Sequence, residues 1–232
     1  MNLEFGGNMK VDPSKYVKVM IESIDQYLLD NLNILRGRDL YEFYRTLFYK
    51  LKGFFGGSWG FEGVTEILVF RAFHHILGGN AEVIDITKDL KAFYYLERNI
   101  VLGAGLPLMI GNRKIWPDII IYEPRRNDLA ELGKLRSVIE IKAYPQGGLK
   151  AIKREVERLN SIHKHYCYSK LALIVYSINV KFKERSKIWK YLHRRLENEE
   201  GIPGYIDVLL LEECTNKVTE IFTPYISASN AN

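Results

Sequence analysis

The amino-acid sequence predicts an α/β fold in which a central mixed β-sheet is flanked by helices and preceded by an N-terminal helical extension. Three observations predict this class. Near the N-terminus, apolar residues recur every three or four positions, as they do on one face of a helix. The middle of the chain contains short runs rich in β-branched and aromatic residues, which favour strands. Extended and helical patterns then alternate toward the C-terminus, as expected for a sheet with helices packed against it.

The individual elements follow from these patterns. Helices are expected over residues 13–28, 40–51, 61–77, 149–166 and 184–197. The helix over 61–77 is apolar nearly all round, so we expect it to be buried. Strands are expected over 81–86, 117–124, 136–144, 170–178 and 206–211. Residues 91–102 are ambiguous, and residues 127–135 are expected to form an excursion between two neighbouring strands.

Length and composition favour a single domain. The chain has 232 residues, of which 47% are hydrophobic, enough to bury one sizeable core. We assign residues 1–60 to the helical extension of this domain, 61–225 to its core and 226–232 to a disordered tail. Aromatic residues of the extension, such as Tyr41, Phe43, Tyr44 and Phe48, suit either this core or a dimer interface.

The sequence also indicates a cellular compartment. No apolar run reaches the ~18 residues of a membrane span, and the polar opening lacks the apolar segment of a secretory signal. We therefore expect a soluble protein without membrane contact, in the cytoplasm of its cell or of a viral host. Cys167 and Cys214 have no metal-binding spacing, so both are expected to be reduced and buried.

The net charge of +5 is unevenly distributed along the chain. Residues 149–195 contain 13 Lys and Arg against 3 Asp and Glu, a local charge of +10, so the remainder carries −5. A basic half of this kind is typical of a phosphate-binding surface, although a solvated helix face is an equally open reading. The cations expected on the outer face of the helix over 149–166 are Lys150, Lys153, Arg154 and Arg158.

Charged residues interrupt two of the most apolar predicted strands. Side chains alternate between the faces of a strand, so Glu140 and Lys142 point the same way, opposite to Ile139 and Ile141. Asp118 opens the neighbouring strand. Buried charges are costly unless they are paired or bind a metal. Phosphodiester hydrolysis needs such a set, because carboxylates hold Mg²⁺ and a lysine orients the nucleophile.

These residues carry a resemblance to a known family. Pro117-Asp118, followed after 21 residues by Glu140-Ile141-Lys142, resembles the signature of the PD-(D/E)XK nuclease superfamily. The resemblance implies a restriction-endonuclease-like αβββαβ core over residues 61–211, with the signature on its second and third strands. It also implies that Asp118, Glu140 and the Ile141 carbonyl bind Mg²⁺, with Mn²⁺ as a substitute, and that Lys142 positions the attacking water.

Family members also bring a glutamate from the first core helix toward the metal. Glu66 and Glu62 are the candidates, and we prefer Glu66 because it shares a helix face with Val69 and Phe73. Gln146 follows the signature as a glutamine does in some exonuclease branches, so we expect it to contact DNA. The implied function is a DNA endonuclease that acts as a homodimer on double-stranded or branched DNA.

Several alternatives stay open at this stage. Glu140 and Lys142 would also suit an ion pair on an exposed strand face, and Asp118 a strand start satisfied by backbone amides. Asp89-Leu90-Lys91 matches the same short pattern by chance, without an upstream Pro-Asp. The histidines are expected to be packing residues rather than ligands. A catalytically silent nucleic-acid-binding or assembly protein and an RNA-directed nuclease are the alternative functions.

Overall fold

The computed structural model of the chain describes residues 13–51, 62–126, 128–145, 147–178, 182–194 and 201–227. Its helices are α1 (Pro13–Asn31), α2 (Gly37–Leu51), α3 (Glu62–Ile76), α4 (Gly148–His163), α5 (Phe182–His193) and α6 (Val218–Ile226). Its strands are β1 (Glu82–Thr87), β2 (Leu90–Tyr95), β3 (Ile100–Ala104), β4 (Leu108–Ile110), β5 (Arg113–Ile115), β6 (Ile119–Arg125), β7 (Asp128–Lys142), β8 (Lys170–Val175) and β9 (Ile206–Leu210). Two short 3-10 helices, η2 (Leu96–Arg98) and η3 (Leu211–Glu213), follow β2 and β9.

The predicted α/β class and its mixed central sheet are confirmed. Seven strands form one sheet in the order β1-β2-β3-β6-β7-β8-β9, and β4 and β5 form a separate hairpin. The strands from β1 to β7 pair antiparallel, whereas β7, β8 and β9 run parallel. Strand β7 therefore lies where the antiparallel part of the sheet meets its parallel part.

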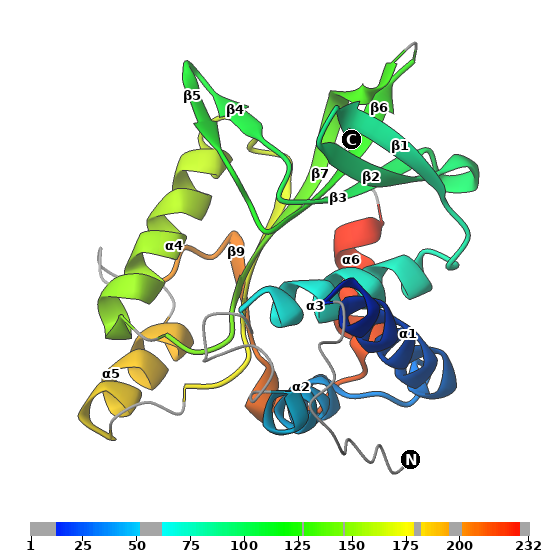
Figure 1. The fold of residues 1–232 in the computed structure, drawn as a ribbon. Helices are drawn as coiled ribbons and strands as arrows, with labels where there is room; N and C mark the ends of the chain where they lie inside the picture. Colours follow the sequence, from blue (N-terminus) through cyan, green and yellow to red (C-terminus); the bar gives the residue numbers. More distant parts are fainter. Residues whose placement is uncertain are drawn as a thin grey trace.

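Helices cover both faces of the sheet (Figure 1). On one face, α1, α2, α3 and α6 share a hydrophobic cluster with Ile139 and Ile141 of β7. On the other face, α4 and α5 share a second cluster with Val138 of the same strand. The alternation of side chains predicted for the last residues of β7 is thus confirmed, because Val138 enters one cluster and Ile139 and Ile141 enter the other.

The N-terminal helices belong to the first of these clusters. Tyr41 and Tyr44 of α2 are buried in it, and Tyr27 stacks on Phe43 with ring centroids 3.8 Å apart. Tyr41 and Tyr44 therefore belong to the core, and Tyr27 and Phe43 lie half-buried against it. Among the described residues, no helix is both long enough and apolar enough to cross a membrane.

Residues 128–135 correct the prediction of an excursion. They extend β7, pairing with β6 from Tyr122↔Leu135 to Arg125↔Asp128 across several register shifts. At one irregularity, a side chain on Gly133 would place its Cβ 2.9 Å from the Glu123 carbonyl oxygen. Glycine and the bulges hid the alternating pattern, since a bulge moves the apolar positions out of register.

The ambiguous residues 91–102 form the hairpin of β2 and β3. Its turn runs through η2 and through Asn99, whose φ of 49° lies in the left-handed region. Helix α6 and the β4–β5 hairpin were not predicted. Ile226 ends α6 and is buried, so it does not belong to the disordered tail predicted for residues 226–232. Residues 228–232 of this tail lie outside the described part of the chain.

The cysteine prediction is corrected in part. Both cysteines are free, but Cys167 is exposed and Cys214 is half-buried. Cys214 packs where η3 ends, so close to Gly37 that a Cβ there would lie 2.6 Å from the cysteine Cβ. Glycine at position 37 therefore allows the start of α2 to approach the C-terminal part of the chain.

An ion-pair network fastens α1 to α3. Arg71 donates two hydrogen bonds to the Asp25 carboxylate, at 2.6 and 2.7 Å, and His75 Nε2 lies 3.0 Å from the same group. Burial raises the pKa of Asp25, but the bonds from Arg71 and His75 outweigh it, so the pKa lies below its ordinary value. The network therefore stabilises the fold while Asp25 is ionised.

We predict that Asp25→Asn lowers the free energy of unfolding by about 2 kcal/mol at neutral pH, because Arg71 loses its charged acceptor. A carboxyl whose pKa is depressed by folding contributes stability that is lost as the pH falls through its folded pKa. The difference from wild type should therefore shrink below about pH 4 in urea unfolding experiments. Asp30→Asn, at an exposed position of the same helix, is the control. Equal loss in both variants would contradict the role of the network.

Candidate active site

Strand register brings Asp118 and Glu140 together. Ile119 pairs with Ile139 across the antiparallel β6–β7 ladder, so the preceding residue, Asp118, comes opposite Glu140. Opposed residues of an antiparallel pair point to the same face. The Ile141 N–H donates a hydrogen bond of 2.6 Å to Asp118 Oδ2, which fixes the aspartate against β7. The structure therefore brings together the residues of the predicted signature.

Glu140 is the most deeply buried of these residues. Its exposed fraction is 0%, and its carboxylate forms an ion pair with the Arg158 guanidinium of α4. Among the described residues, Glu140 Oε1 has no hydrogen-bond partner. The burial of Glu140 rules out the alternative of an ion pair on an exposed strand face. A buried carboxylate oxygen without a hydrogen-bond donor is costly, so Oε1 requires an explanation.

Helix α4 supplies a second buried acid, Glu155, that sequence reasoning missed. Glu155 is 2% exposed, and its Oε1 lies 3.3 Å from Lys142 Nζ. Its Oε2 lies 3.3 Å from Arg158 Nε, and Arg154 adds a more exposed contact of 3.4 Å to Oε1. Glu155 thus links the signature lysine to the arginine that contacts Glu140.

The sequence contains a signal for Glu155. The inner face of α4 is formed by Ile152, Val156, Leu159 and Ile162, and Glu155 lies within this apolar stripe. An acid on the apolar face of an amphipathic helix needs a cationic partner. The helical pattern shows that Glu155 is buried, but it does not show which cation pairs with it. Arg158 was expected on the outer face, but the structure places it half-buried within the site instead.

Helix α3 places Glu66 near the same cluster. The Tyr176 hydroxyl, at the end of β8, donates a hydrogen bond of 3.1 Å to the Thr65 carbonyl and holds the first turn of α3 against the sheet. Glu66 is half-buried, and its charge acts on Arg158. The side chain of Glu62 lies outside the described part of the chain, so only Glu66 can be placed.

The cluster is crowded with charge. Burial raises the pKa of Asp118, while the Ile141 hydrogen bond and the charges of Lys142 and Arg158 oppose this shift. Burial likewise lowers the pKa of Arg158, against the attraction of Asp118 and Glu66. With every group ionised, the acids Asp118, Glu140, Glu155 and Glu66 carry −4 and the cations Lys142, Arg154 and Arg158 carry +3, which leaves −1. A bound cation would offset this remainder.

The donor atoms fit a hard cation, although the carboxylates are not gathered around a single point. Within the described ranges, no group of three or more His, Cys, Asp or Glu side chains is placed to hold a metal ion. Mg²⁺ is usually bound through one or two carboxylates and keeps several waters. Asp118 and the unpartnered oxygen of Glu140 are two carboxylates beside the Ile141 backbone that could bind such an ion.

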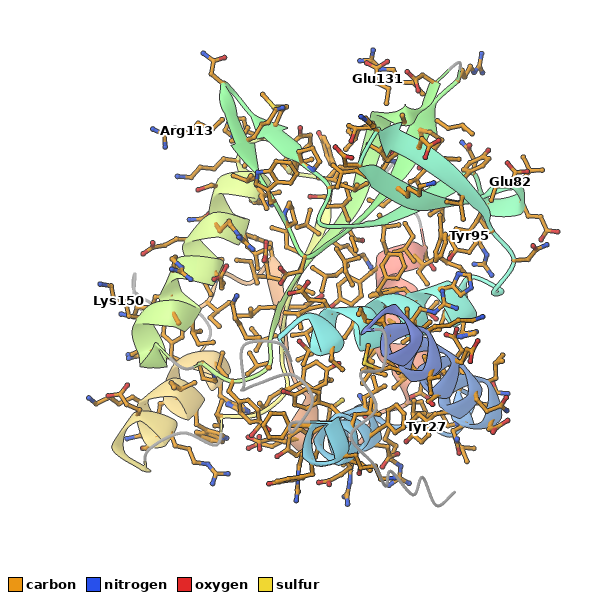
Figure 2. The ribbon with its side chains drawn as sticks, viewed as in Figure 1. Tyr27, Glu82, Tyr95, Arg113, Glu131 and Lys150 are labelled. Carbon is orange, nitrogen blue, oxygen red and sulfur yellow. The ribbon has the colours of Figure 1, made fainter. Side chains whose placement is uncertain are left out.

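The remaining predicted binding residues lie on α4 or just before it. Lys150, Lys153 and Arg154 are exposed, and Lys153 Nζ lies 5.6 Å from the centroid of the Tyr191 ring. Figure 2 shows Lys150 pointing outward from α4. Gln146 lies outside the described residues. These lysines and Arg154 therefore remain on the predicted outer face.

His74, His75 and His163 pack as predicted, whereas His165 is exposed. His74 is buried, with Nδ1 2.7 Å from the Tyr95 hydroxyl, and burial lowers its pKa to about 4, so its ring is neutral at neutral pH. His75 belongs to the Asp25 network, and the His163 ring stacks on Tyr205 with centroids 3.7 Å apart. Among the described residues, none of these three histidines forms a hydrogen bond or an ion pair with Asp118, Glu140 or Lys142.

The chain was compared with known proteins in three ways. No protein-family model, no curated protein and no solved structure matches it. The fold and the site are therefore interpreted from the chain's own residues.

We predict that Glu155→Gln lowers the free energy of unfolding by about 3 kcal/mol, because Lys142 and Arg158 lose a buried counter-charge. Glu157→Gln, two residues away on the exposed face of α4, should change it by less than about 0.5 kcal/mol. Guanidinium unfolding of both variants measures the difference. Equal stabilities would show that Glu155 does not compensate these cations.

Proposed function

We propose that this chain is a Mg²⁺-dependent nuclease of the PD-(D/E)XK superfamily that hydrolyses phosphodiester bonds in DNA. One observation carries the proposal: the fully buried Glu140 lies opposite Asp118 on the sheet, two residues before Lys142. Buried charges on a core strand are costly, so their presence at one place favours a chemical role. The preceding Pro117 and the spacing between the two segments match the family signature.

The order of the elements supports a restriction-endonuclease-like core. Helix α3 is followed by the antiparallel strands β1, β2, β3, β6 and β7, with the β4–β5 hairpin between β3 and β6, and then by α4 and by β8, which runs parallel to β7. With β1, β2 and the hairpin counted as additions, α3, β3, β6, β7, α4 and β8 follow the αβββαβ order that the resemblance implies. Asp118 precedes the second of the three strands, and Glu140 and Lys142 end the third.

In this proposal, Asp118, Glu140 and the Ile141 carbonyl hold Mg²⁺, with Glu66 beside them. The bound cation would polarise the phosphate and acidify a water, and Mn²⁺ would substitute for it. Ile141 contributes twice, because the N–H and C=O of one residue of an extended strand point to the same side, so its carbonyl faces the same side as the N–H that fixes Asp118.

Lys142 would orient the attacking water. Its side chain is 27% exposed, so its ammonium reaches solvent, and the contact with Glu155 holds it on the face of Glu140. An ammonium in this position donates a hydrogen bond to the water and steadies negative charge as it develops. Glu155 is then a positioning residue, since it acts on the reaction through Lys142 and Arg158.

Basic residues outside the cluster would hold the substrate. The exposed Lys150, Lys153 and Arg154 follow one side of α4 and suit contacts with backbone phosphates. Cutting both strands of a duplex requires two sites, so we propose that the enzyme acts as a homodimer on double-stranded or branched DNA.

A catalytically silent nucleic-acid-binding protein is the second candidate. The ion pair between Arg158 and Glu140 favours it, because the arginine neutralises the carboxylate without a metal. Cleavage assays on supercoiled, linear, single-stranded and four-way-junction DNA and on RNA, with Mg²⁺, Mn²⁺ or EDTA, separate the candidates. Binding without cutting on every substrate would support the silent protein, and a preference for RNA would correct the substrate.

We predict that Asp118→Asn, Glu140→Gln and Lys142→Met each reduce cleavage by roughly 10²-fold or more, while affinity for DNA is largely kept. Asp89→Asn and Lys91→Met are matched controls, because these exposed residues form the same short pattern on the β1–β2 turn and at the start of β2. They should cut at the wild-type rate. Wild-type cutting by any signature variant would remove that residue from the mechanism.

Metal binding has a readout independent of cutting. Arg158 and a cation compete for Glu140, so Mg²⁺ should raise the melting temperature of Arg158→Gln more than that of wild type. Glu140→Gln should abolish the shift. Thermal melting with and without Mg²⁺ measures all three proteins. An equal shift in all of them would place the cation elsewhere.

A further inference from the structure

A second cationic surface lies at the far end of α4 from Lys150. The hairpin of β4 and β5 stands beside the last turns of α4 (Figure 1), and a pocket of about 370 Å³ lies between them. Its polar lining comes from Arg113, Arg158, Lys164, His165 and Ser161, with two isoleucines of the hairpin. No acid is among the described residues that line it. The pocket thus suits an anionic ligand.

The hairpin is held firmly enough to form a wall of this pocket. The Tyr166 hydroxyl, just beyond α4, donates a hydrogen bond of 2.8 Å to the Met109 carbonyl of β4. Gly111, with a φ of 56°, forms the tight turn between β4 and β5. His165 Nδ1 lies 3.1 Å from the Ser161 carbonyl, which can only accept, so Nδ1 donates this hydrogen bond and holds the ring at the end of α4.

Arg158 joins the pocket to the candidate active site. Its guanidinium contacts Glu140 and Glu155, and the same side chain lines the pocket. The chain makes a second connection, because Ile115 of the pocket is followed closely by Asp118. Between them lies Trp116, whose side chain is 51% exposed. An exposed indole that follows the pocket residue Ile115 in the chain is suited to stacking on a base.

We propose that this pocket holds the phosphodiester backbone of the nucleic-acid strand that enters the active site, and that Trp116 stacks on one of its bases. The inference rests on the proposed nuclease function, since it assigns the path of that enzyme's substrate. Arg113 and Lys164 contact phosphates from opposite walls, the hairpin and the end of α4. Arg113 and Lys150 lie toward opposite ends of α4 (Figure 2), so the bound nucleic-acid strand runs along this helix.

The test measures binding rather than cutting. Short fluorescein-labelled single-stranded and duplex DNA oligonucleotides are titrated in EDTA at several salt concentrations with wild type and with Arg113→Gln/Lys164→Gln. The double variant Arg113→Gln/Lys164→Gln should bind both oligonucleotides at least roughly 10-fold more weakly than wild type at low salt. The slope of log affinity against log salt should fall by about 1.4 for single strands and about 1.8 for duplex. Trp116→Ala should weaken single-strand binding, and Trp116→Phe should restore most of it.

Lys50→Gln/Arg98→Gln is the matched control, because it removes the same charges from exposed positions on α2 and η2. If the pocket pair and the control pair have the same affinity and slope, the inference is overturned even if wild type cuts DNA. If wild type cuts nothing but the pocket pair alone loses binding, the subsite stands and the nuclease function fails. If inorganic phosphate displaces the labelled oligonucleotide as effectively as unlabelled oligonucleotide does, the pocket is a site for free phosphate. That result would overturn the assignment of the pocket to a nucleic-acid strand.

Discussion

The complete burial of the Glu140 carboxylate constrains the structure around it. Desolvating a carboxylate in a central strand is unfavourable by several kcal/mol unless cations lie close by. Arg158 provides this compensation from α4, and Glu155 in turn compensates Arg158 and Lys142. The position of α4 on the sheet is therefore determined by charge as well as by its apolar stripe.

The site also depends on the change of strand direction at β7. Because β6 runs antiparallel to β7, the start of β6 lies beside the end of β7, and Asp118 meets Glu140. Because β8 runs parallel to β7, α4 must cross one face of the sheet between them, and it carries Glu155 and Arg158 to the same end. Neither an all-parallel nor an all-antiparallel sheet would bring these two sources of charge together.

Most of the fold could be predicted from periodicity, but the parts that complete the site could not. The alternation of Glu140 and Lys142 with isoleucines identified both their shared face and the strand, since the period of two is unambiguous there. The length of β7 was missed because bulges and Gly133 disrupt the period. The β4–β5 hairpin has a Gly-Asn turn that could have indicated it, although its strands are only three residues long. The roles of Glu155 and Arg158 depend on contacts between elements distant in sequence, which local patterns do not encode.

Strand β7 has one further consequence, which concerns how the protein acquires its structure. Its residues enter the hydrophobic clusters on both faces of the sheet, and the charged cluster lies at the same strand end. A nascent chain that has ordered only α1 to β7 lacks Arg158 and Glu155, so Glu140 has no counter-charge from α4. The charged cluster is therefore complete only after α4 has emerged and docked on the sheet. A molecule in which α4 is missing or undocked holds Asp118 and Glu140 without the arginine that pairs with Glu140.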